Sequence, residues 1–137
     1  MSRSIPVLPG CALLLGLGLA TLGAPSGAAE RETFSLGGNT VTVHAFEFLD
    51  QQELDTLRLV GTDPQALALF MGEGSGHGAI ALAPDQGFIR DGMPAPGVAA
   101  LAQLPDAETA REAALSMCEQ ERGSGSACVV VLELTPN

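Results

Sequence analysis

Residues 106–134, DAETAREAALSMCEQERGSGSACVVVLEL, contain the helix, the loop and the strand that decide the fold. Asp106 has the side chain of a helix N-cap, and the spacing of apolar residues after it predicts a helix from about Ala107 to Glu121. The face predicted to pack against the rest of the domain consists of Ala110, Ala113, Ala114 and Met117. Because alanine side chains are small, this helix can lie close to a sheet. The stretch therefore predicts a long helix packed on one face of a β-sheet.

The segment after this helix predicts a buried strand and a disulfide. Residues 123–126, GSGS, form a flexible loop, and the valine run within residues 128–134 indicates a central strand. Cys118 lies near the end of the helix, and a helix-to-strand reversal of this length can bring it within bridging distance of Cys128. Catalytic dithiols, in contrast, are usually closely spaced at a helix N-terminus. We therefore expect a structural Cys118–Cys128 disulfide, worth roughly 3 kcal/mol in the loop-entropy description.

The residues before the helix predict the rest of the sheet. Residues 33–48 alternate between apolar and polar side chains around a turn at residues 37–39, which is typical of a β-hairpin. The apolar run at residues 79–82 predicts a further buried strand. The run at residues 98–104 is too short to distinguish a strand from a helix.

Two short helices are expected between the hairpin and the strand at residues 79–82. Asp50 and Glu53 have the spacing of a capping box, and Asp63 caps the second helix with Pro64 at its first position. The other predicted positions are the inward-facing Leu54, Leu57, Leu59, Leu67 and Phe70 and the helix-ending Gly61 and Gly72. The predicted fold class is therefore α+β: a small, mainly antiparallel sheet with one long helix packed on a face, plus short helices.

Residues 1–29 have the pattern of a removable export signal. A positive start is followed by an apolar run to about residue 22, and small residues precede a cleavage point after Ala29. Glycine and proline interrupt the run, which is shorter than the roughly 20 apolar residues of a membrane span. Cys11 falls inside the run, whereas the cysteine of a lipid-attachment site follows it, so lipid attachment and a retained anchor are the less favoured alternatives. We predict a signal peptide at residues 1–29 and one periplasmic or secreted domain at residues 30–137.

Composition excludes several classes of function. The net charge is −10 at pH 7, whereas nucleic acids and anionic membrane surfaces require a positive face. The chain contains no lysine, which excludes Schiff-base chemistry, including pyridoxal phosphate held on lysine, and a Walker-type nucleotide site. Without Trp and Tyr, a site that stacks sugars or bases would depend on phenylalanine. We expect no cofactor, no nucleic-acid partner and no stable membrane insertion after signal removal.

The candidate ligand-binding residues lie in the glycine-rich segment 72–78, GEGSGHG. His77, flanked by Gly76 and Gly78, could act as a base or a polarising donor at the mouth of a loop. The alternatives are a loop histidine bonded to the backbone, and glycines that let the backbone pass close to a neighbouring element. His44 falls on the polar phase of its strand, where exposure is expected. The histidines and cysteines match no zinc spacing and no serine or carboxylate set has a catalytic pattern, so we predict no metal and no catalytic residue.

Three short motifs in the C-terminal half form a pattern. They are Gly78-Ala79-Ile80-Ala81, the alanine-rich helix that ends in Cys118, and Cys128-Val129-Val130-Val131. Together they resemble a family of small secreted bacterial domains of unknown function, over about residues 76–134. The mature chain is also similar to exported proteins sometimes named aminolevulinate synthase, but that enzyme is several times longer and holds pyridoxal phosphate on a lysine. The resemblance implies the α+β fold and the disulfide, and it implies no catalytic residue.

These features predict a non-catalytic accessory domain that binds a partner, either a protein or a small molecule. The alternative is a small-ligand or metal-binding protein that uses the glycine-rich loop around His77. A third, less favoured hypothesis is a small hydrolase with His77 as its base. Ligand-dependent melting that disappears in His77→Ala would favour the second hypothesis, and turnover that disappears in the same variant would favour the third.

Overall fold

The computed structural model describes residues 29–137, so the predicted export signal, except Ala29, lies outside the described residues. Five strands form one sheet in the order β1-β2-β7-β3-β6, and every neighbouring pair is antiparallel. They are β1 (Glu30–Leu36), β2 (Asn39–Ala45), β7 (Val129–Pro136), β3 (His77–Leu82) and β6 (Ala99–Leu104). The helices are α1 (Gln51–Thr62), α2 (Pro64–Met71) and α3 (Ala107–Glu121), and a small ribbon consists of β4 (Ile89–Arg90) and β5 (Met93–Pro94). The predicted α+β class is confirmed.

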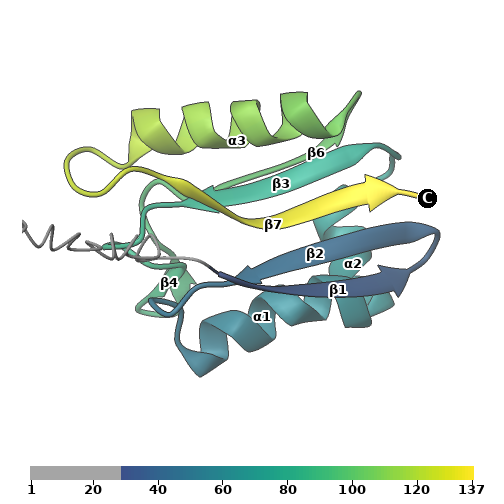
Figure 1. Cartoon of the computed structure of the whole chain (residues 1–137), viewed down its shortest axis with the longest axis horizontal. Helices are drawn as coiled ribbons and strands as arrows, with labels where there is room; N and C mark the ends of the chain where they lie inside the picture. The colour runs from purple at the N-terminus through teal and green to yellow at the C-terminus, as the bar shows by residue number, and fades with distance from the viewer. Residues whose placement is uncertain (1–28) are drawn as a thin grey trace, which may run out of the picture.

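Helices cover both faces of the sheet (Figure 1). α3 packs on β3, β6 and β7 on one face, as predicted, while α1 and α2 lie on the opposite face. In Figure 1, α3 lies above β3 and β6, and β1 and β2 lie at the opposite edge of the sheet. Among residues 29–137, no helix is both long enough and apolar enough to cross a membrane.

The two faces of the sheet bury different kinds of side chain. The core under α3 consists of small residues: Ala79, Ala81, Ala83, Ala99, Ala110, Ala114, Cys118 and Cys128. The core under α1 and α2 is made of larger ones, including Val41, Val43, Leu57, Leu67, Ile80, Leu82, Leu132 and Leu134. β7 contributes to both cores from the centre of the sheet, which confirms the prediction from its valine run. The alanine core explains how a long helix packs closely on a narrow sheet.

The predicted Cys118–Cys128 disulfide is present and joins the end of α3 to the residue before β7. The two Cα atoms are 6.2 Å apart, and Cys118 is completely buried. Glu119 accepts a hydrogen bond of 2.7 Å from the backbone N–H of Cys128. That hydrogen bond, together with the ion pair to Arg122, lowers the pKa of Glu119. The junction between helix and strand is therefore held by a covalent bond and by a charged hydrogen bond.

The packing face of α3 differs by one position from the prediction. Met117 is 43% exposed, and Cys118 is buried in its place. Because Cys118 lies four residues after Ala114, which lies four after Ala110, these three side chains form one stripe along the helix. Met117 lies outside that stripe.

The first short helix also differs in detail from the prediction. Leu59 is 48% exposed, and Val60 is buried instead. Gly61 does not end the helix, which continues to Thr62. A Cβ atom at Gly61 would lie only 2.7 Å from Cβ of Phe34, so this glycine allows α1 to approach β1 closely.

The predicted helix starts are confirmed. Asp50 accepts a hydrogen bond of 2.8 Å from the N–H of Glu53, whose side chain accepts one of 3.3 Å from the N–H of Asp50. Asp63 and Asp106 cap α2 and α3 by accepting hydrogen bonds from backbone N–H groups of the first helical turn. The ambiguous run at residues 98–104 contains a strand, β6.

Candidate functional site

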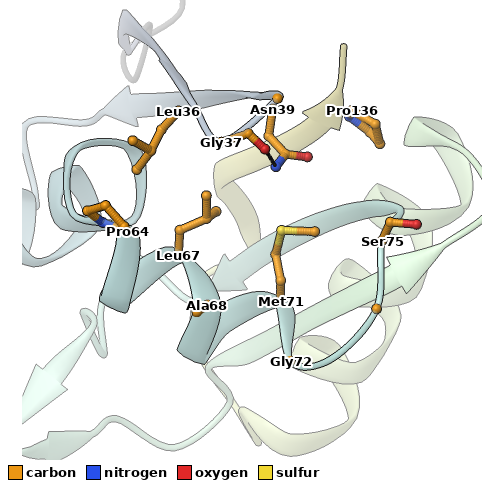
Figure 2. Close-up of a pocket in the computed structure, with 12 residues that line it drawn as sticks. Leu36, Gly37, Asn39, Pro64, Leu67, Ala68, Met71, Gly72, Ser75 and Pro136 are labelled. Carbon is orange, nitrogen blue, oxygen red and sulfur yellow. Dashed lines mark hydrogen bonds between the residues drawn. The ribbon is translucent and has the colours of Figure 1, made fainter.

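A surface pocket of about 530 Å³ lies between the β1–β2 turn and α2 (Figure 2). Its lining comes from three segments that are far apart in the sequence. These segments supply Leu36, Gly37, Gly38 and Asn39; Pro64, Leu67, Ala68, Met71, Gly72, Gly74 and Ser75; and Pro136. The pocket lies at the end of the sheet that carries the β1–β2 turn and the C-terminus (Figure 1).

One face of α2 forms a wall of the pocket. Pro64, Leu67, Ala68 and Met71 have the i, i+3, i+4, i+7 spacing of a single helix face. Leu67 is buried and forms the base, whereas Pro64 and Ala68 are exposed. In Figure 2 the side chains of Leu67 and Met71 point from the helix toward the β1–β2 turn. The sequence pattern predicts an inward-facing Leu67, but it does not indicate that the helix lines an open pocket.

The polar side chains of the pocket are few, and that of Asn39 is held in place. Asn39 is only 7% exposed, and its Nδ2 donates a 3.0 Å hydrogen bond to the carbonyl oxygen of Gly37. That bond closes the β1–β2 turn and orients the amide group. Ser75 lies on the opposite side of the pocket, in the glycine-rich segment. The pocket therefore combines apolar walls with a small number of polar groups, the pattern of small-molecule sites.

The glycine-rich segment is divided between the pocket and the sheet. Gly72, Gly74 and Ser75 line the pocket, whereas Gly76, His77 and Gly78 are not among its lining residues. At Gly76 and Gly78, the backbone of this segment passes close to β6. A Cβ atom at Gly76 would lie 2.8 Å from the carbonyl oxygen of Leu104, and one at Gly78 would lie 2.8 Å from that of Leu101. This is the close approach expected for glycines in this segment.

His77 begins β3, opposite Leu104 of β6. Its Nδ1 is buried and has no hydrogen-bond partner among the described residues. The pKa of Asp106, the N-cap of α3, is lowered chiefly by hydrogen bonds from Thr109. Ligand binding by His77, Gly76 and Gly78 stays a prediction.

His44 is only 16% exposed at its side chain, so the expectation of an exposed histidine was wrong. Its Nε2 lies 2.7 Å from Oε2 of Glu133 on β7, and this contact covers the imidazole. Within residues 29–137, no group of three or more His, Cys, Asp and Glu side chains is arranged to hold a metal ion.

Comparison of the chain with protein-family models, with curated proteins and with solved structures found no match. The resemblance to small secreted bacterial domains therefore remains a prediction from the motifs.

Replacing Gly78 by alanine should lower the free energy of unfolding by about 1–3 kcal/mol, because the added Cβ meets both Leu101 and Phe70 in a packed interior. Gly38→Ala is the control, because Gly38 has a positive φ of 75° but nothing within 4 Å of the added atom. Urea denaturation should show a larger loss for Gly78→Ala than for Gly38→Ala. A free energy of unfolding in Gly78→Ala equal to that of the native protein would mean that the approach to β6 does not require a glycine.

Proposed function

We propose that this protein is a non-catalytic exported binding domain that holds a small, mainly apolar ligand in the pocket between the β1–β2 turn and α2. The observation that carries the proposal is the pocket itself. Its volume of about 530 Å³ lies within the range of roughly 300–1,000 Å³ of small-molecule sites. Its walls are apolar, and its few polar groups come from Asn39 and Ser75.

The lining indicates the chemistry of the ligand. An apolar body would contact Leu36, Leu67 and Met71, and burial of that body supplies most of the binding free energy. A hydroxyl, carbonyl or amide group at one end would find a hydrogen-bond partner in Asn39 or Ser75. The lining residues carry no ionisable side chain, so a neutral ligand fits better than a charged one.

Export is part of the same proposal. The Cys118–Cys128 disulfide supports it, because such bonds persist in oxidising compartments such as the periplasm and the extracellular space. The signal pattern at residues 1–29 supports it independently.

Filling the pocket should abolish ligand binding. In Ala68→Trp the large indole occupies space beside Leu67 and Met71, so we expect the affinity for a neutral apolar dye such as Nile red to fall at least about tenfold. The protein folds normally in this variant because Ala68 is exposed. Dye titration followed by fluorescence measures the affinity.

Leu69→Trp is the matched control, since Leu69 is the next residue of the same helix, is 85% exposed and does not line the pocket. The chain has no native tryptophan, so each variant carries a single indole whose emission also reports on folding. Dye binding that is as tight in Ala68→Trp as in Leu69→Trp would contradict the proposal.

A further inference from the structure

A second hollow, of about 340 Å³, lies between α3 and the neighbouring strands and is called the arginine groove below. It is lined by ionisable residues of β1, β2, α3 and β7, which are Arg31, His44, Arg111 and Glu133. It lies on the face of the sheet that carries α3, where residues of α3 border residues of β1, β2 and β7. The arginine groove is therefore separate from the apolar pocket, with which it shares no residue.

The charge in this groove contrasts with the rest of the protein. The whole chain carries a net charge of −10 at pH 7, whereas two guanidinium groups and one imidazole line this groove together with a single carboxylate. Glu133 is already engaged: its Oε2 lies 2.7 Å from His44 Nε2, and its Oε1 lies 3.4 Å from Arg111 Nε. The groove is therefore net positive even when His44 is neutral.

Arg31 is the cation in this groove that lacks a counter-ion. Among residues 29–137, no carboxylate lies within ion-pairing distance of it. Its strand neighbours Glu30 and Glu32 alternate to the other face of the sheet, where Glu32 pairs with Arg58. Arg31 lies directly opposite His44 in the β1–β2 register, so its cross-strand neighbour is an imidazole and not a carboxylate. A bound anion would supply the missing counter-ion.

Apolar side chains adjoin the charged groups. Phe46 and Leu115 line the same groove, and both are partly buried. Glu108 and Glu112 flank Arg111 along α3 and line a separate hollow with it, so they weaken its attraction for an external anion. Arg31, on the far side of the groove, therefore supplies the main attraction.

We infer that the arginine groove binds an organic monocarboxylate with an apolar chain, whose carboxylate pairs with the guanidinium groups of Arg31 and Arg111. The planar guanidinium matches the two oxygens of a carboxylate. A single negative charge suits a groove in which two guanidinium charges face one carboxylate. The chain of the ligand lies against Phe46 and Leu115.

Titration with hexanoate, followed by amide chemical shifts in two-dimensional NMR, tests this inference. Saturable shifts are expected in β1, β2 and α3, and no comparable shifts in α2 or residues 72–75, which separates this site from the apolar pocket. Arg31→Gln should weaken hexanoate binding about tenfold, because it removes a charged contact. The exposed position of Arg31 on an edge strand leaves the fold intact.

Arg58→Gln is the charge-matched control, since Arg58 lies on α1 at the opposite face of the sheet and should leave the affinity unchanged. Hexanol and hexylamine, which have the same chain without the carboxylate, should give no saturable shift in the groove. The inference is overturned if hexanol binds the groove as tightly as hexanoate, if inorganic phosphate does so, or if Arg31→Gln binds hexanoate as the native protein does.

Discussion

Replacing both Cys118 and Cys128 by alanine should lower the free energy of unfolding by about 3 kcal/mol. The bond closes a loop between residues that are ten positions apart and joins the end of α3 to the start of the central strand. Without it, the unfolded chain gains conformational freedom that the native state does not share. A loss of this size is a large fraction of the roughly 5–15 kcal/mol that stabilises a typical domain.

Urea denaturation of three samples separates the contribution of the covalent crosslink to stability from the contribution of the packed cysteine side chains. The native protein in reducing buffer loses the covalent bond but keeps both sulfur atoms, whereas the double alanine variant also loses their packing in the alanine core. Both samples should unfold at lower urea concentrations than the oxidised native protein, and the alanine variant at the lowest. An alanine variant with the same urea midpoint as the oxidised protein would show that the crosslink contributes nothing to stability.

The features that the sequence predicted correctly depend on residues close together in the chain. The Asp50–Glu53 capping box spans one helical turn, and the Cys118–Cys128 pair spans one loop. The alternation along the hairpin and the valine run of β7 each specify a strand without reference to the remaining fold. The prediction of buried positions was wrong where either of two neighbouring helix residues could face the sheet, as at Met117 and Cys118.

The apolar pocket could not be predicted, because its walls meet only in the folded protein. The β1–β2 turn, α2 and the glycine-rich segment are each visible in the sequence, but the strand order β1-β2-β7-β3 is what brings them together. One local signal was present: the short stripe Pro64, Leu67, Ala68 and Met71 marks a helix face. The partners of His44 were likewise hidden, since Glu133 lies 89 residues away.

Glu53 gives the clearest example of a role that no local pattern indicates. Besides completing the capping box, its Oε2 accepts hydrogen bonds from the backbone N–H groups of Phe88 and Ile89, the latter at 3.0 Å. Glu53 is only 6% exposed. It therefore links the start of α1 to the segment that enters β4, two parts of the chain that the sheet alone does not join.

Glu53→Ala should consequently lower the free energy of unfolding by about 3 kcal/mol, because it removes charged hydrogen bonds and leaves partly buried backbone N–H groups without their acceptor. Gln52→Ala is the control, since Gln52 is an exposed neighbour in the same helix turn. Hydrogen exchange at the amides of Phe88 and Ile89 should accelerate in Glu53→Ala and stay unchanged in Gln52→Ala.

If the two variants are equally stable, the capping box and the β4 contact do not depend on this carboxylate. If Glu53→Ala is less stable but those two amides exchange at the native rate, the loss comes from the helix start alone, and Glu53 does not anchor the segment that enters β4.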